Sequence, residues 1–157
     1  MTAVVEIRAE PPDGAATRAL FAEYLVLLQD RLGLRFKPSE RIFATEAAFA
    51  GPDGAWLVLY DCGRPVGCGG LRTLAPGVGE IKRMFVTQSA RRSGHGRLLL
   101  HELERLAVRR GHTCVRLLTT EVLSEARKLY AAEGYRVIER MVRGSDPVEI
   151  WLEKDVP

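Results

Sequence analysis

A short loop rich in arginine and glycine is the part of the sequence best suited to bind an anion. The loop reads Arg91-Arg92-Ser93-Gly94-His95-Gly96-Arg97, and the leucine-rich start of a helix follows it directly. Glycine lets the backbone approach a ligand, and the first turn of a helix presents unpaired N–H groups and the positive end of its dipole. Arginine adds fixed charge and forked donors. These residues predict a pyrophosphate site, although a plain turn with solvated arginines has the same composition.

The order of residues in this loop separates it from two other phosphate-binding motifs. It reads Arg91-x-x-Gly94-x-Gly96, which is not the G-x-G-x-x-G of dinucleotide-binding folds, and no Gly-Lys-Ser/Thr follows as in P-loop NTPases. The motif resembles the Gln/Arg-x-x-Gly-x-Gly/Ala signature of the GNAT superfamily of N-acetyltransferases. The resemblance implies an enzyme that uses acetyl-CoA, whose pyrophosphate would be bound by Arg91, Arg92, Ser93, Gly94, His95, Gly96 and Arg97.

The strand before the loop is the second part of the resemblance. Residues 80–86, Glu-Ile-Lys-Arg-Met-Phe-Val, stand where the family has a central strand that splays from its parallel neighbour and leaves a V-shaped cleft. The resemblance implies that the backbone of Met84, Phe85 and Val86 binds the pantetheine arm like an added strand and polarises the thioester carbonyl. An ordinary buried strand has the same apolar pattern, and the two interpretations are compatible.

The third part of the resemblance is the segment from Leu123 to Tyr135, which is similar to the family pattern Ala-x-x-Leu-Tyr-x-x-x-Gly-Tyr/Phe. It implies that Tyr130 donates a proton or hydrogen bond to the departing thiolate of coenzyme A, which a phenol with a pKa of about 10 can do. The alternative is that Tyr130 packs against the sheet. Many family members have Asn where this chain has Leu123. Ser124 is then a candidate for contact with coenzyme A, although capping the helix explains it equally well.

An amine must lose a proton before it attacks a thioester, so the reaction requires a base or a water chain that leads to one. Glu80 is the candidate that the resemblance favours. Strand alternation places Lys82 and Met84 on the same face, and a neighbouring lysine makes a carboxylate a poorer base. A surface ion pair is therefore the alternative role for Glu80, and Glu149 is a second candidate base. Cys68 is a possible nucleophile, but it has no histidine nearby in the sequence to activate it. Its small side chain between glycines suits a tightly packed strand instead.

The three histidines have weaker claims to chemistry. The resemblance places His95 beside the phosphates rather than the thioester, so we expect its backbone N–H to matter and its ring to be solvated rather than to act as a base. We expect His101 on a helix surface and His112 in a loop, with no second ligand at metal-binding spacing. No metal site is predicted.

Length and composition limit the class of protein. The chain has 157 residues, of which 46% are hydrophobic and 27% charged. No apolar run approaches the ~20 residues that cross a bilayer. We expect one domain, residues 1–157, with no secretory signal, no membrane partner and a cytoplasmic location. The three cysteines, Cys62, Cys68 and Cys114, fit neither a disulfide framework nor a zinc site.

Positive charge is concentrated around the loop. The net charge is +3, and residues 91–110 hold six arginines and two glutamates. A local excess of this kind suits a small anionic ligand, whereas duplex nucleic acid usually needs a broader basic face. We therefore expect no nucleic-acid partner.

Hydrophobic periodicity and turn residues predict an α+β fold. Strands are predicted at residues 4–9, 55–60, 65–72, 80–86, 114–118, 135–140 and 148–153, and helices at about 20–32, 38–49, 96–110 and 124–133. The strand at 114–118 follows a crossover helix and should pair in parallel with an earlier strand. The resemblance to the GNAT superfamily implies a mixed, mostly antiparallel sheet flanked by helices, with a splayed central strand pair that forms the acyl-CoA cleft.

These features predict an N-acetyltransferase that moves an acetyl group from acetyl-CoA to the primary amine of a small molecule by direct attack. Four arginines, Arg35, Arg41, Arg72 and Arg83, could grip a carboxylate and so suit an amino-acid-like acceptor, although solvated arginines are the plainer interpretation. A non-catalytic acyl-CoA sensor, the acetylation of a protein amine, and a nucleic-acid binder are the alternatives. The sequence leaves the formation of a homodimer open.

Overall fold

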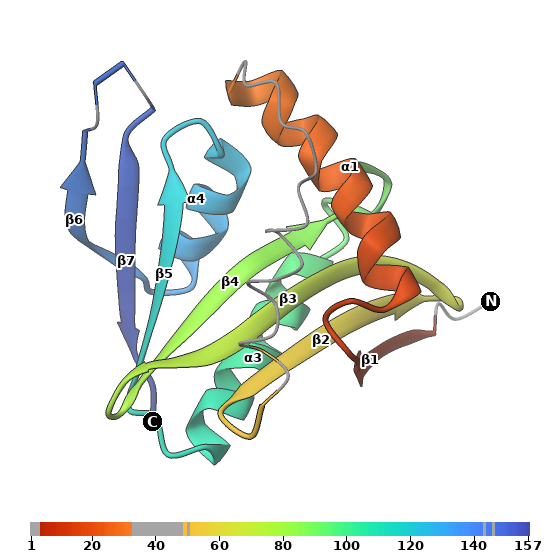
Figure 1. Ribbon diagram of the computed structural model, residues 1–157, viewed down its shortest axis with the longest axis horizontal. Coiled ribbons are helices and arrows are strands. Elements are labelled where there is room, and N and C mark those ends of the chain that lie inside the picture. Colours follow the sequence, from red (N-terminus) through yellow and green to blue (C-terminus); the bar gives the residue numbers. More distant parts are fainter. Residues whose placement is uncertain (1–3, 33–48, 50, 143, 146) are drawn as a thin grey trace.

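The computed structural model describes residues 4–32, 49, 51–142, 144–145 and 147–157, which form a mixed α+β fold (Figure 1). The strands are β1 (Val5–Ala9), β2 (Gly54–Asp61), β3 (Arg64–Ala75), β4 (Val78–Val86), β5 (Cys114–Thr120), β6 (Arg136–Met141) and β7 (Glu149–Asp155). The helices are α1 (Ala15–Leu32), the short 3-10 helix η2 (Gln88–Ala90), α3 (His95–Arg109) and α4 (Ser124–Ala132).

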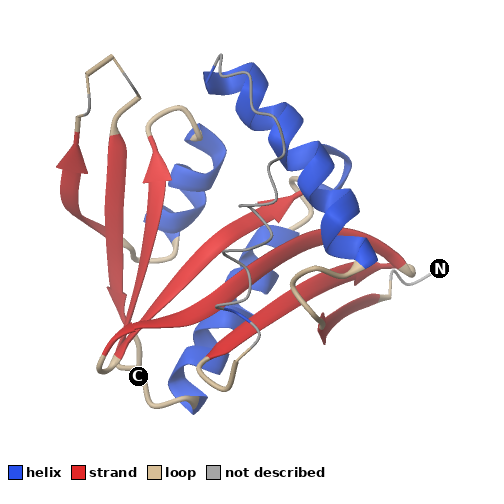
Figure 2. Cartoon of the chain, viewed as in Figure 1, coloured by secondary structure: helices blue, strands red, loops and turns tan. Residues whose placement is uncertain are grey.

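All seven of these strands belong to one open sheet in the order β1-β2-β3-β4-β5-β7-β6. Every neighbouring pair is antiparallel except β4 and β5, which run parallel because α3 carries the chain from one to the other. Figure 2 shows how the helices flank the strands. The predicted fold class, including the single parallel pair, is confirmed.

The parallel pair is joined over only part of its length. Residues Val78–Ile81 of β4 pair with Cys114–Leu117 of β5, and no pairing between the two strands follows in the described residues. Beyond this point Lys82–Val86 and Leu118–Thr120 diverge, which Figure 1 shows as the spreading upper ends of β4 and β5. We call this divergent segment the splay. β5 stays paired with β7 along its whole length, so each strand has one open edge at the splay.

A β-bulge lies on β4 within the splay. Cys68 pairs with Phe85 and Gly70 with Lys82, so two residues of β4 oppose the one residue between them on β3. Arg83 takes a left-handed conformation there, with φ of 55°. The extra residue reverses the side-chain alternation, so that Phe85 shares the face of Glu80. The expectation that Met84 lies on that face is therefore wrong, and Met84 instead packs in the cluster on the opposite side.

The two faces of the sheet are covered by different helices. On one face Leu20 and Phe21 of α1 pack with Trp56 and Phe85, and the indole N–H of Trp56 donates to the buried Thr17 hydroxyl at 2.7 Å. On the other face, leucines of α3 pack against β2 to β5 together with Tyr130 of α4. Figure 1 shows α1 in front of the sheet and α3 behind it. The splay thus has α1 on one side and α3 and α4 on the other.

Two local predictions have different outcomes. The helix predicted at 38–49 lies outside the described residues, apart from Phe49. The prediction that Ser124 caps α4 is wrong, because Leu123 holds the N-cap position and Ser124 is the first helical residue. The Glu125 carboxylate accepts a hydrogen bond from its own backbone amide, which serves the first turn instead. No helix among the described residues is long and apolar enough to span a membrane.

Candidate active site

The arginine–glycine loop leads from η2 into the first turn of α3. Gly94 is the N-cap residue, with φ of 81°, a conformation that strains any residue with a Cβ. The first hydrogen bond of α3 runs from the Leu98 N–H to the Gly94 carbonyl at 3.0 Å. The N–H groups of His95, Gly96 and Arg97 precede that bond and are the donors that a helix start offers to an anion.

Gly96 is required for a different reason from Gly94. A Cβ at position 96 would lie 3.3 Å from Cδ2 of Leu129 on α4, whereas a Cβ at position 94 would have no atom within 4 Å. Gly96 therefore lets α3 and α4 pack closely. Gly94 alone leaves open space for a ligand beside the backbone.

His95 is held inside the protein. Its side chain is only 10% exposed, and Nε2 lies 3.1 Å from Oδ2 of Asp61 at the end of β2. Nδ1 contacts the Ser93 hydroxyl, which also contacts the Ala90 carbonyl. The expectation of a solvated ring is wrong, because the hairpin of β2 and β3 supplies an anionic partner that lies distant in the sequence. His95 fixes the loop to the hairpin.

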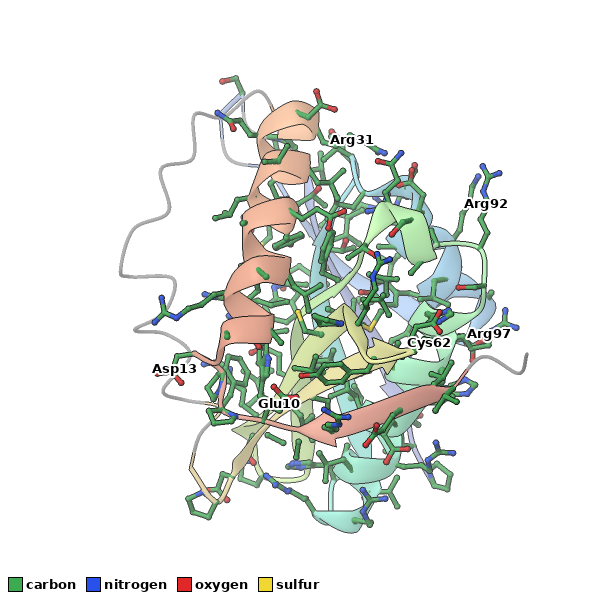
Figure 3. All side chains as sticks on the ribbon, turned by 90° about the vertical axis from the view of Figure 1, so that its right-hand side faces the viewer. Glu10, Asp13, Arg31, Cys62, Arg92 and Arg97 are labelled. Carbon is green, nitrogen blue, oxygen red and sulfur yellow. The ribbon has the colours of Figure 1, made fainter. Side chains whose placement is uncertain are left out.

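The three loop arginines have different surroundings. Nε of Arg91 donates to the Val86 carbonyl at 3.2 Å, which places its guanidinium at the end of β4. Arg92 is exposed, has φ of 67°, and points away from the body of the protein (Figure 3). Nε of Arg97 lies 2.6 Å from Oε1 of Glu133, so this arginine is engaged with α4.

Glu80 is a buried carboxylate next to the splay. Its side chain is 2% exposed, and Oε1 lies 2.6 Å from Nε of Arg72, its direct cross-strand partner on β3. The ion pair weighed as an alternative is therefore present, although Glu80 is buried rather than on the surface. No hydrogen bond or ion pair of the second carboxylate oxygen is found among the described residues.

Tyr130 faces the same region from α4. It is 6% exposed, and its ring packs edge-on against Tyr135 with 5.7 Å between centroids. Burial raises the pKa of the Tyr130 hydroxyl well above its usual value, and the nearby Tyr24 adds to this. Within the described part of the chain the hydroxyl has no hydrogen-bond partner. It is therefore a protonated donor without an internal acceptor.

Tyr24 brings a second phenol to the splay from α1. Its ring lies 5.1 Å from that of Phe85, and burial raises the pKa of its hydroxyl. On β5 the Thr120 hydroxyl is buried and lacks a hydrogen-bond partner among the described residues. A buried polar atom without a partner is destabilising unless a ligand or water satisfies it. The splay therefore carries polar groups that suit a polar ligand.

The remaining candidates from the sequence have other surroundings. Cys68 is fully buried under α1, and Glu149 begins β7 in register with Thr120. His101 contacts Glu133 on α4. The described residues contain no group of three or more His, Cys, Asp or Glu side chains placed to hold a metal ion.

A split parallel strand pair, with a helix N-terminus and arginines at its open end, can bind an extended anionic ligand between its backbones. The model of the acetyltransferase (GNAT) family matches residues 17–135 of the chain. The chain belongs to this family. It is therefore a GNAT acyltransferase, and the sequence-based identification is confirmed.

Two relatives in sequence support the assignment to the GNAT family, and two solved structures share its fold. "IAA acetyltransferase" of Azospirillum brasilense is 37% identical over 108 residues, which cover 67% of this chain and 70% of the relative. The uncharacterized N-acetyltransferase YsnE of Bacillus subtilis is 31% identical over 107 residues, which cover 66% of this chain and 71% of the relative. A putative acyl-CoA N-acyltransferase from Klebsiella pneumoniae superposes with a TM-score of 0.75 at 27% identity and 97% coverage of both chains. A GNAT acetyltransferase from Staphylococcus aureus, at 16% identity, shares the fold with a TM-score of 0.80 over 98% of this chain and all of the other.

Four residues at the splay or beside the arginine–glycine loop were not singled out by the sequence. Tyr24 is one position of the apolar stripe of a predicted helix, and Thr120 lies two residues beyond the strand predicted at 114–118. Asp61 falls in a hairpin turn, where aspartate is common. Lys82 was considered only as a neighbour of Glu80. Each is a polar residue in an ordinary setting for its type, so the sequence alone does not distinguish it from other polar residues.

Proposed function

We propose that this GNAT acyltransferase transfers an acetyl group from acetyl-CoA to the primary amine of a small molecule by direct attack. The observation that carries the proposal is the splay, which ends at the first turn of α3. There an extended ligand would meet open strand edges along its length and an anion site at its end.

The donor is proposed to bind along the splay. The N–H groups of the first turn of α3, together with Arg91 and Arg92, would hold the pyrophosphate, and Arg97 would contribute through its backbone. The backbone of Met84 and Phe85 would pair with the pantetheine arm. The buried Thr120 hydroxyl, which has no internal partner, supports a polar ligand on the opposite wall. Ser124 at the start of α4 stays a candidate contact.

The acceptor amine is proposed to lose its proton to Glu80 or to a water chain that ends there. Arg72 occupies one oxygen of this carboxylate at 2.6 Å and leaves the other to accept a proton. The amine would then attack the thioester carbonyl, whose oxygen is polarised by the backbone near Phe85. The C–S bond would break, and Tyr130 would give its proton to the departing thiolate. The attacking nitrogen would lose its remaining extra proton through water to the Tyr130 phenolate, which restores the phenol and leaves the neutral amide.

The proposal of a small-molecule acceptor draws on the relatives. One relative in sequence and one in structure carry the name "IAA acetyltransferase"; the second, from Bacillus cereus, superposes with a TM-score of 0.73 at 20% identity. Both names describe a small-molecule substrate rather than a protein.

The test is the release of coenzyme A from acetyl-CoA over a set of small amines. Glu80→Gln and Tyr130→Phe should each lower kcat by roughly 10²-fold, which is the low end of acid–base catalysis. Tyr60→Phe is the matched control, because it removes a phenol hydroxyl on β2 that contacts Glu10. The proposal fails if no amine is acetylated although acetyl-CoA raises the Tm, or if both variants keep full kcat.

A further inference from the structure

Lys82 occupies the point where β4 and β5 part. The last β4–β5 pair joins Ile81 and Leu117, so Lys82 is the first residue of β4 without a partner on β5. On its other side it pairs with Gly70 of β3, which has no side chain. Lys82 therefore has no side chain directly beside it on either neighbouring strand.

The surroundings of Lys82 exclude water, and no described residue forms an ion pair with it. The space above Gly70 is filled by the rings of Trp56 and Phe49, because a Cβ there would lie within 2.8 Å of both. These rings form an apolar wall next to Lys82. The side chain is half-buried, and burial lowers the pKa of its ammonium group.

The carboxylate on the face of Lys82 is already engaged. Lys82 shares its face with Glu80, but Glu80 is paired with Arg72, and no salt bridge of Lys82 is found among the described residues. A half-buried ammonium without an anionic partner is unfavourable unless a ligand supplies one.

We propose that Lys82 binds a carboxylate of the acceptor, so that the substrate is an amino acid or a related amino carboxylate. This inference rests on the proposed function, because it places the acceptor amine at the splay beside Glu80. The carboxylate would form an ion pair with Lys82 at the point where the strands part. Its binding would hold the amine next to the backbone of β4, where the thioester carbonyl is polarised.

The test compares matched acceptors that differ only in charge: an amino acid, its carboxamide and the corresponding decarboxylated amine. Steady-state kcat and KM are measured for each acceptor with the intact protein and with Lys82→Met and Lys82→Arg. Arg105→Met is the control, since it removes one positive charge from the exposed Arg105–Glu102 pair on α3, which packs on the other face of the sheet.

Lys82→Met is expected to raise the KM of the amino acid at least tenfold and to leave the KM of the carboxamide and of acetyl-CoA within about twofold. Lys82→Arg should recover most of the affinity for the amino acid, because it restores the charge. The inference is overturned, with the proposed function intact, if the intact protein acetylates the neutral amines as efficiently as the amino acid. It is also overturned if Lys82→Met lowers kcat equally for all three acceptors and flattens the pH profile, which would make Lys82 a base. If no amine is acetylated, the proposed function fails first and this inference with it.

Discussion

Nε of Arg97 lies 2.6 Å from Oε1 of Glu133, so the first turn of α3 is tied to the C-terminal end of α4. Glu133 also contacts His101, and this hydrogen bond, with the charge of Arg97, holds the pKa of the Glu133 carboxyl below its usual value. Arg97 thus has an anionic partner of its own. Arg91 and Arg92 form no ion pair with any described residue, and their charges remain for a ligand.

We therefore expect the loop arginines to differ in their effect on acetyl-CoA. Arg91→Ala and Arg92→Ala should each raise the KM for acetyl-CoA about tenfold, since a hydrogen bond to a charged group contributes roughly 1.5–3 kcal/mol. Arg97→Ala should change this KM less than threefold. Calorimetric titration with coenzyme A should rank the affinities of the three variants in the same order. Unchanged affinity in the first two variants would show that the pyrophosphate binds elsewhere.

Asp61 is expected to support the loop through His95. Asp61→Ala leaves Nε2 of a nearly buried imidazole without its partner, which should lower the free energy of unfolding by about 1 kcal/mol. Because His95 begins α3, the KM for acetyl-CoA should rise while kcat at saturation stays close to normal. Urea unfolding and steady-state kinetics separate the two effects. A fall in kcat alone would indicate that His95 takes part in the reaction.

The two glycines of the motif should respond differently to alanine. Gly94→Ala forces a Cβ into a left-handed conformation, which costs about 1–2 kcal/mol, and puts a methyl group into the space left for the ligand. Gly96→Ala instead crowds Leu129 across the contact between α3 and α4. We expect the first variant to lose mainly coenzyme A affinity and the second mainly thermal stability. Calorimetric titration measures the affinity, and the Tm measures the stability. If both variants lose affinity and stability to the same extent, the two glycines do not have the separate roles assigned to them.

The cysteines are expected to differ in reactivity. Burial, with a hydrogen bond to Glu153, raises the pKa of the Cys114 thiol to about 11, whereas Cys62 is exposed. Because the folded-state pKa is raised, the stability from this thiol is complete below about pH 9 and is lost as the pH rises toward 11. The exposed cysteine should also react before the others. At pH 8 iodoacetamide should modify Cys62 first, as mass spectrometry would show. The Cys62→Ser variant should then remain almost unlabelled in its native state.

The ion pair of Arg31 and Glu125 should make the free energy of unfolding depend on pH in the acidic range. Nη2 of Arg31 lies 2.9 Å from Glu125, and this contact, with the backbone amide of Glu125, lowers the pKa of the carboxyl to about 2. A lowered folded-state pKa gives stability that is present above about pH 4.5 and is lost as the pH falls toward 2. Since 55% of the Glu125 side chain is exposed, the loss should stay below about 1 kcal/mol. Arg31→Met should flatten this part of the profile of stability against pH.

The sequence predicted the elements of the fold well because their signals are local. Apolar runs separated by turn residues marked β2 and β3, alternating apolar residues marked β4, and the leucine stripe with its terminal arginines marked α3. The helix predicted from residue 96 begins one residue earlier, at His95. These features depend on residues within a few positions of one another, which single-sequence patterns capture.

The details of the candidate site depend on contacts between distant residues, which local patterns do not contain. The bulge at Arg83 reverses the strand alternation, and no glycine marks it in the sequence. The partner of His95 is 34 residues away, on another strand, and that of Arg97 is on another helix. The surroundings of Lys82 could not be predicted for the same reason, because its neighbour on β3 is Gly70, which is distant in the sequence.

The short junction between β4 and β5 has a mechanical consequence. Four residue pairs carry the connection between the β1–β4 half of the sheet and the β5–β7 half. At the far end of the splay, the contact of Arg31 with Glu125 bridges α1 and α4. Hydrogen exchange in the two halves should therefore be weakly coupled in the free protein. A ligand with peptide-like amides, seated between them, would act as an eighth strand and join the two halves into one cooperative unit.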